Sequence, residues 1–230
     1  MKKHYPWLWF DADNTLFDYN KAETTALMKS LQLFGLPFDG TSTDAYRKIN
    51  QDLWEALERQ EIKPEVLRVR RFELFLESIG STGPAEKLSD TYIKQLGLCF
   101  DLIDGAFEVL NAFHGKSRIF IVTNGLTGVQ RSRLELSPVK QFINEIVISE
   151  EIGAAKPHAA FFDVAFARAG NPSKSEILMI GDSLTSDMRG GVDYGIDTCW
   201  FNPSGESKPD DLPVTYEIRK LRDLFEIIER

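Results

Sequence analysis

Apolar and polar positions follow two different patterns along the chain, and the first covers residues 18–100. Four stretches of this region repeat apolar residues at the spacing of an amphipathic helix. Their apolar positions are Leu27, Leu31 and Phe34; Ile49, Leu53, Trp54 and Leu57; Val69, Phe72, Leu76 and Ile79; and Leu88, Tyr92, Leu96 and Cys99. Gly35 and Pro37 end the first stretch. This pattern predicts a small helical bundle.

From about residue 103, short β-branched runs alternate with helical stretches. The runs are RIFIVTNG, NEIVISEE, EILMIGDS and DTCWFN, and the stretches between them include LTGVQRSRLEL and HAAFFDVAFARAG. Strands that alternate with helices of this length indicate βαβ units and a parallel sheet covered on both faces. The opening run WLWF has the same texture as a buried strand. The sequence therefore predicts an α/β domain made of residues 1–17 and 103–230, with a helical domain, residues 18–102, inserted after its first strand.

Polar residues that could act in catalysis or bind a metal follow the predicted strands. In an open parallel sheet, ligands bind outside the carboxyl ends of the strands, so these residues should meet at one edge. They are Asp11 and Asp13 after the first strand, Thr123 and Asn124 after the second, Asp182 and Asp187 after the strand that ends at Ile180, and Lys156 before the helix HAAFFDVAF. The sequence places a candidate site there.

Several carboxylates that converge on one point cannot all stay ionised without a compensating charge. A divalent cation resolves the conflict, and Mg²⁺ suits one or two carboxylates together with a phosphate oxygen of a substrate. The histidines His4, His114 and His158 are scattered, so no cluster indicates zinc. The residues therefore predict a magnesium site whose ligands come from Asp11, Asp13, Asp182 and Asp187.

With a metal present, the remaining groups acquire roles in phosphoryl transfer. One carboxylate of the first pair can attack phosphorus and form an aspartyl-phosphate. Its partner two residues further on can protonate the leaving oxygen and then activate water. Thr123, Asn124 and the ammonium group of Lys156 can hold the non-bridging phosphoryl oxygens.

Four motifs carry a resemblance to a known family. DADNT, VTNG, the AAKP that contains Lys156, and GDSLTSD resemble, in order, the four motifs of the haloacid dehalogenase superfamily of phosphohydrolases. The resemblance implies a Rossmann-like, three-layer α/β core with an inserted helical cap. It implies the following roles: Asp11 as nucleophile and metal ligand, Asp13 as general acid/base with its main-chain carbonyl on the metal, Thr123 as phosphate binder, Lys156 as charge stabiliser, Asp182 as metal ligand, and Asp187 as a ligand through water or a brace for Lys156.

Within that superfamily, several longer stretches resemble the pyrimidine 5′-nucleotidases. They include FDADNTLFD, INQDLWEALERQEI, VTNGLTGVQRSRLE and GDSLTSDMRGGVDYGIDTCWFN. This resemblance implies hydrolysis of pyrimidine nucleoside monophosphates such as UMP, dUMP and dTMP. Phosphatases for phosphoglycolate or sugar phosphates would share every catalytic residue, and a β-phosphoglucomutase-like phosphomutase is a further alternative.

Five residues of the helical region could touch a base or sugar, or belong to the core of the bundle. They are Asn50, Trp54, Arg68, Arg71 and Phe72, and aromatic residues at helical spacing belong more often to a core than to a ligand platform. Glu150 and Glu151 are interpreted as solvated loop surface.

The composition of the chain limits the kinds of molecule that it is expected to bind. The chain has 230 residues, with 35 acidic and 27 basic residues, a formal charge of −8 and an isoelectric point near 5.0. It has no long basic run, so polymeric DNA or RNA is not an expected partner. The apolar run after Lys3 stops at Asp11, too short for a signal peptide or a membrane span, and Cys99 and Cys199 are expected to be buried free thiols. We expect a cytoplasmic enzyme that acts on a small phosphomonoester as a monomer or weak homodimer.

Overall fold

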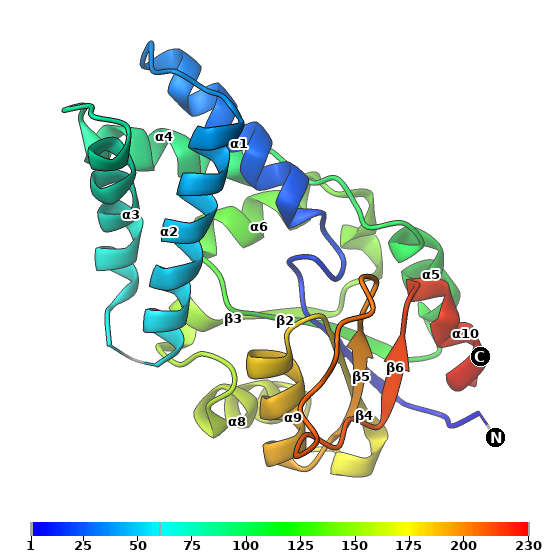
Figure 1. Ribbon diagram of the computed structural model, residues 1–230. Helices are drawn as coiled ribbons and strands as arrows, with labels where there is room; N and C mark the ends of the chain where they lie inside the picture. Colours follow the sequence, from blue (N-terminus) through cyan, green and yellow to red (C-terminus); the bar gives the residue numbers. More distant parts are fainter. Residues whose placement is uncertain (1, 60, 230) are drawn as a thin grey trace.

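The computed structural model describes residues 2–59 and 61–229, and a parallel six-stranded sheet forms its centre (Figure 1). The strand order is β3-β2-β1-β4-β5-β6. The strands are β1 (Trp7–Phe10), β2 (Arg118–Thr123), β3 (Glu145–Ile148), β4 (Ile177–Gly181), β5 (Asp197–Phe201) and β6 (Tyr216–Ile218). The five predicted strands are confirmed. The sixth was not predicted, because its three residues are too few to show a pattern.

The register of the central strands brings their carboxyl ends level. Phe10 of β1 lies opposite Ile121 of β2 and Ile180 of β4. The chain continues this alignment past the strand, because the amide of Asp11 donates to the carbonyl of Ile180 over 2.8 Å. Polar residues that follow β1, β2 and β4 therefore emerge at one edge of the sheet.

Helices cover both faces of the sheet, as predicted for a three-layer α/β fold. Adjacent residues of β1 point to opposite faces: Leu8 and Phe10 pack in one apolar cluster, and Trp9 packs in the other. The first cluster is covered by α5 (Ala106–Phe113), the short helix Pro138–Phe142 and α10 (Leu224–Ile227). The second is covered by α8 (Ala159–Arg168) and borders α9 (Arg189–Tyr194). Burial of both faces explains why the strands are continuously apolar.

Four helices between β1 and α5 form a layer beyond the sheet (Figure 1). They are α1 (Tyr19–Leu33), α2 (Gly40–Glu58), α3 (Pro64–Ser78) and α4 (Ala85–Gly97). Their apolar stripes meet in a third cluster that includes Leu27, Leu31, Phe72 and Tyr92. Asp18 caps α1 by accepting from the amide of Lys21 over 2.9 Å. The predicted helical bundle is confirmed, and it is called the helical layer below.

The two connections between the helical layer and the sheet lie side by side. Phe17 and Leu102 form an antiparallel bridge, and the amide of Asp18 donates to the carbonyl of Asp101 over 2.9 Å. These connections coincide with the predicted boundaries near residues 17 and 103. The division of the chain into two domains there stays a prediction.

Within residues 2–59 and 61–229, no helix combines the length and apolar character required to cross a bilayer. Cys99 and Cys199 are both buried and free, as expected from the sequence.

Candidate active site

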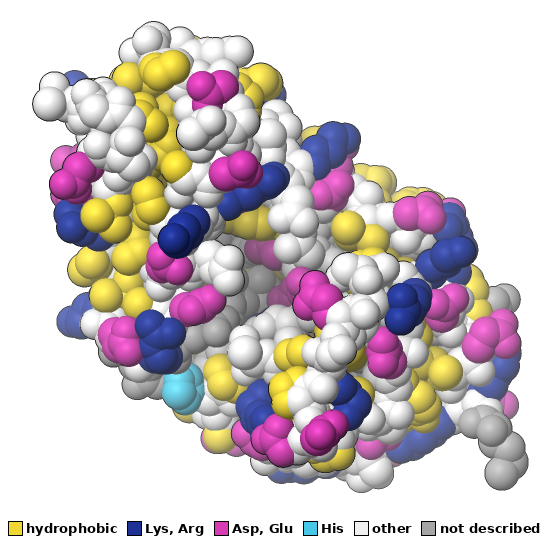
Figure 2. Space-filling model, viewed as in Figure 1, with side chains coloured by type: hydrophobic (Ala, Val, Ile, Leu, Met, Phe, Trp, Pro, Cys, Tyr) yellow, Lys and Arg dark blue, Asp and Glu magenta, His cyan; other side chains and the backbone are white. Residues whose placement is uncertain are grey.

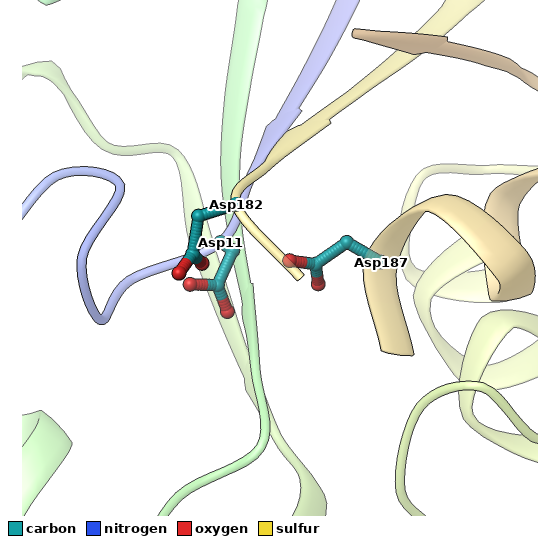
Figure 3. A group of neighbouring side chains, drawn as sticks. All are labelled: Asp11, Asp182 and Asp187. Carbon is teal, nitrogen blue, oxygen red and sulfur yellow. The ribbon is translucent and has the colours of Figure 1, made fainter. Parts of the chain in front are cut away.

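Three carboxylates meet at the carboxyl edge of the sheet (Figure 3). Asp11 follows β1, Asp182 follows β4, and Asp187 comes from the π-helical turn Leu184–Met188. One oxygen from each lies within 4.8 Å of those of the other two. Asp11 is 7% exposed and Asp187 is 1% exposed, so these charges are largely removed from solvent. The structure thus brings together three of the four predicted metal ligands by their side chains.

Lys156 supplies a buried positive charge beside them. Its Nζ donates to Asp11 over 2.7 Å, to Asp187 over 2.6 Å and to the carbonyl of Val122 over 2.7 Å. Burial alone would lower the pKa of Lys156, but the charges of Asp11 and Asp187 outweigh this effect and raise its pKa above the ordinary value. The side chain is therefore a fixed ammonium group with all three protons hydrogen-bonded.

One ammonium group does not compensate three carboxylates. Burial raises the pKa of Asp11 well above its usual range, although Lys156 opposes the shift. Burial, followed by the charge of Asp187, raises the pKa of Asp182 to about 7. Keeping these carboxylates ionised in the folded protein is therefore costly, and a bound divalent cation would offset that cost. Carboxylate oxygens are hard donors of the kind that Mg²⁺ prefers.

The chain around Asp187 is shaped to bring its carboxylate close to β4. A Cβ atom at Gly181 would collide with the Asp187 carboxylate, so glycine permits the approach. The amide of Ser183 also donates to Asp187 over 3.1 Å, and the Ser183 hydroxyl accepts from the amide of Ser186 over 3.1 Å. These contacts aim Asp187 back at Lys156.

Asn124 is engaged with the loop that carries Lys156. Its Nδ2 donates to the carbonyl of Lys156 over 2.9 Å, and its Oδ1 accepts from the amide of Lys156 over 2.8 Å. This reciprocal pair fixes the backbone of Lys156, a positioning role that the sequence had not indicated. The predicted phosphate contact of Asn124 stays a prediction.

Thr123, the last residue of β2, is 1% exposed. Its hydroxyl oxygen is buried without a hydrogen-bond partner among the described residues. Buried hydroxyl groups normally have a partner, so an orphaned one beside Asn124 fits a site built for an additional polar ligand. The role of Thr123 as a phosphate binder stays a prediction that this observation supports.

Asp13 is held apart from the acidic cluster. Its carboxylate accepts from Arg133 Nη1 and, over 2.7 Å, from Gln130 Nε2. Both donors lie on α6 (Thr127–Leu136), and sequence reasoning missed them. Gln130 and Arg133 are three residues apart, so they lie on one face of the helix, next to the buried residues Val129 and Leu134. This spacing was the signal in the sequence that could have indicated two polar side chains directed inward.

A cleft of about 430 Å³ separates the acidic cluster from the helical layer. Its sheet side is lined by Asp11, Asp13, Lys156, Asp182 and Asp187, and its helical side by Tyr19, Gln51, Trp54 and Glu55. Figure 2 shows the corresponding hollow, with acidic side chains around it. The cleft therefore joins the candidate chemistry to one face of α2.

The structure sorts the residues of the helical layer that the sequence left uncertain. Trp54 lines the cleft. Asn50, Arg71 and Phe72 are buried within the layer, where Asn50 Oδ1 accepts from Arg71 Nη1 over 3.1 Å. Arg71 and Phe72 therefore belong to the layer's interior, and only one of the two aromatic candidates borders the cleft.

The interpretation of Glu150 as solvated loop surface is wrong. Glu150 lies in the short helix α7 (Ser149–Ile152) and accepts from Arg68 Nη2 of α3 over 2.5 Å. Its other oxygen accepts from the amide of Thr127 over 2.8 Å. The position resembled a loop because α7 is only four residues long, too short for a helical pattern. Glu151 lies in the same short helix and pairs with Arg131, so the loop interpretation is wrong for it as well.

A comparison with known protein families supports the α/β architecture described above. Residues 8–201 match the family model of the haloacid dehalogenase-like hydrolases. This match covers most of the chain, and the chain belongs to that family. It is therefore an enzyme of the hydrolase class.

Individual relatives span nearly the whole chain. It is 33% identical over 224 residues to the pyrimidine 5′-nucleotidase YjjG of Escherichia coli, covering 97% of this chain and 98% of the relative. It is 32% identical to the pyrimidine 5′-nucleotidase PynA of Streptococcus pneumoniae, covering 98% and 96%. The crystal structure of the HAD-hydrolase YfnB of Bacillus subtilis superimposes with a TM-score of 0.93 at 35% identity, covering 99% of this chain and 100% of that one. That structure is described as bound to magnesium and as revealing interdomain movement.

Proposed function

We propose that this enzyme is a magnesium-dependent phosphomonoester hydrolase that acts through an aspartyl-phosphate on Asp11. Its preferred substrates are pyrimidine ribo- and deoxyribonucleoside monophosphates such as UMP, dUMP and dTMP. The observation that carries the proposal is the contact of Lys156 with both Asp11 and Asp187 at the edge where three carboxylates converge. The relatives named pyrimidine 5′-nucleotidases support the substrate class. The proposal includes action in the cytoplasm as a monomer or weak homodimer, on small substrates and not on polymeric nucleic acid.

The metal ligands in this proposal are the carboxylates of Asp11 and Asp182 and the main-chain carbonyl of Asp13. Asp187 would either reach the metal through a water or brace Lys156, and its 2.6 Å contact with Nζ supports the second role. When bound, Mg²⁺ would supply positive charge that offsets the charges of the carboxylates and of a substrate phosphate.

In the first half-reaction, a carboxylate oxygen of Asp11 attacks phosphorus. The bond between phosphorus and the leaving oxygen breaks, and Asp13 donates a proton to that oxygen. Thr123, Asn124 and Lys156 hold the non-bridging oxygens, on which transition-state charge develops. The products of this half are a free nucleoside and the aspartyl-phosphate.

In the second half-reaction, Asp13 is a carboxylate and accepts a proton from water as the water attacks phosphorus. The bond between phosphorus and Asp11 breaks, which releases inorganic phosphate and restores the Asp11 carboxylate. One residue can serve both halves because the proton that Asp13 gives in the first is replaced in the second.

The helical side of the cleft suits a flat, polar leaving group. Trp54 offers an aromatic face on which a base can stack. Gln51 and Glu55 line the same cleft, and the Gln51 amide donates to Glu55 over 3.0 Å. An amide and a carboxylate can together accept from the ring N–H of a uracil or thymine and donate to its carbonyl oxygens.

The test is phosphate release, with and without magnesium, from UMP, dUMP, dTMP, purine monophosphates, phosphoglycolate and hexose phosphates. The Asp11→Asn variant serves as the blank. We expect magnesium-dependent release that is highest on the pyrimidine monophosphates. A maximum on phosphoglycolate or hexose phosphates would keep the chemistry and overturn the substrate class. Activity that requires a sugar bisphosphate activator would identify a phosphomutase.

A further inference from the structure

Asp13 is held by two side chains to which the mechanism above assigns no part. Arg133 donates from Nη1 to Oδ1 of Asp13, and Gln130 donates from Nε2 to Oδ2 over 2.7 Å. Each carboxylate oxygen therefore has its own donor. Two donors on two oxygens fix both the direction of the side chain and the rotation of the carboxylate plane.

Arg133 is itself rigidly placed. Its side chain is fully buried, and its Nε donates to the carbonyl of Cys99 over 2.9 Å. Its guanidinium lies 5.6 Å from the ring centre of Phe17 and 5.8 Å from that of Tyr19. Within the described part of the chain, Asp13 is the carboxylate that pairs with this buried charge. Burying the guanidinium of Arg133 costs free energy, and its ion pair with Asp13 offsets that cost. The pairing therefore also holds the Asp13 carboxylate in place.

The contacts of Arg133 reach both connections to the helical layer. Phe17 and Tyr19 lie where the chain enters α1, and Cys99 lies just after α4. One side chain thus contacts the loop that carries Asp13 and the two segments on which the helical layer is mounted.

We propose that Arg133 and Gln130 are positioning residues for Asp13, which hold its carboxyl group at the cleft for proton transfer with the leaving oxygen. The inference rests on the proposed phosphomonoesterase function. The Asp13 side chain is 24% exposed, so without these donors it is free to leave the reactive geometry. A displacement of about 1 Å in such a group is enough to lower a rate by about 10²-fold.

The dependence on the leaving group separates this role from a merely structural one. The 5′-oxygen of a nucleoside needs a proton to leave, whereas p-nitrophenolate leaves readily without one. The ratio kcat/KM reports the steps through formation of the aspartyl-phosphate, in which Asp13 acts as the acid. Misplacing Asp13 must therefore lower kcat/KM more for UMP than for p-nitrophenyl phosphate, whereas partial unfolding lowers both equally.

The experiment compares kcat/KM for these two substrates in Arg133→Met, Arg133→Lys, Gln130→Met and the control Arg131→Met. Arg131 lies on the same helix, is exposed and pairs with Glu151. For Arg133→Met we expect a loss of about 10²-fold on UMP and of less than about fivefold on p-nitrophenyl phosphate. Gln130→Met should show the same bias with a smaller loss. Arg133→Lys should recover part of the loss, because it keeps the charge without the planar fork. Arg131→Met should match the parent on both substrates.

Equal losses on the two substrates, or no loss in either Arg133→Met or Gln130→Met, would overturn the inference. Gln130→Met removes no charge. If Arg133→Met does not fold, the losses of kcat/KM on the two substrates in Gln130→Met test the inference. A parent enzyme that hydrolyses neither substrate with magnesium would overturn the proposed function, and this inference with it. Parent activity combined with unbiased variants would overturn the inference alone.

Discussion

The two sides of the cleft differ in how tightly their side chains are held. On the sheet side, Lys156 and Asp187 are each 1% exposed and bonded to each other. On the helical side, Gln51 and Glu55 are exposed, and their bond to each other is that of neighbouring turns of one helix. Electrostatic catalysis needs groups fixed before the reaction, whereas recognition of a base tolerates adjustment. In the proposed function, the chemistry therefore belongs to the sheet side and the choice of substrate to the helical side.

The largest effect should follow from replacing the proposed nucleophile on the sheet side. Asp11→Asn keeps the shape of the side chain but removes the attacking carboxylate, so phosphate release should fall by at least about 10⁴-fold. Circular dichroism should show an unchanged fold. Release near the parent rate would remove Asp11 from the nucleophile role and break the contrast between the two sides.

Replacing Lys156 should lower the stability of the folded protein. Lys156→Met leaves Asp11 and Asp187 buried without their cation, which should lower the free energy of unfolding by about 3–5 kcal/mol in metal-free buffer. Magnesium should restore part of this loss, because it binds the carboxylates of the folded state. Urea titrations with EDTA and with magnesium check both parts. Lys174→Met, at an exposed lysine in the turn before β4, is the control and should unfold like the parent.

A loss below about 1 kcal/mol for Lys156→Met would mean that the acidic cluster does not depend on its ammonium group. A free energy of unfolding that magnesium raises in neither the parent nor Lys156→Met would instead argue against a cation site at these carboxylates.

On the helical side of the cleft, replacing Trp54 should change the preference for substrates that carry a base without slowing phosphate transfer itself. Trp54→Ala should lower kcat/KM for UMP by about 10-fold to 100-fold, the value of a lost base–aromatic stack. Ribose 5-phosphate has the same phosphate and sugar without a base, so its hydrolysis should change by less than about threefold. Trp54→Phe should keep most of the UMP activity. A similar loss on both substrates would indicate that Trp54 supports the site without contacting the base.

The smallest effect should come from the ion pair that joins the two sides. Arg68 of α3 pairs with Glu150 of α7, but its side chain is 36% exposed, so solvent weakens the interaction. Arg68→Met should lower the free energy of unfolding by less than about 1 kcal/mol. Arg70→Met, on the same helix with an exposed partner in Glu73, is the control. A loss of unfolding free energy above about 2 kcal/mol in Arg68→Met, without such a loss in Arg70→Met, would show that the contact between α3 and α7 is stronger than an exposed ion pair.

The same contrast explains what could be predicted from the sequence. Asp11 and Asp182 directly follow strands whose apolar runs are unmistakable, and parallel pairing then brings them to one edge. Lys156 was placed by the helical pattern of α8 that follows it. The helices of the layer were also predicted, because their apolar stripes are regular.

Side-chain partners across elements could not be predicted in this way. Arg133 contacts Asp13 across 120 residues, and no local pattern specifies the depth at which an arginine is buried. Trp54 and Phe72 have the same apolar character in the sequence, yet one lines the cleft and the other lies in the core. Helix rotation within the layer decides between them, and it depends on packing against several other helices at once.

The most direct test of the central claim is a rapid acid quench of the enzyme during turnover of UMP with magnesium, followed by mass spectrometry of its peptides. The mechanism predicts a phosphoryl group on the peptide that contains Asp11, found with the parent and missing with Asp11→Asn. Phosphate release by the parent with no phosphorylated Asp11 peptide at any quench time would contradict the account. The contradiction would be complete if an Asp13→Asn variant, given p-nitrophenyl phosphate because its leaving group needs no proton, also accumulated no phosphorylated Asp11.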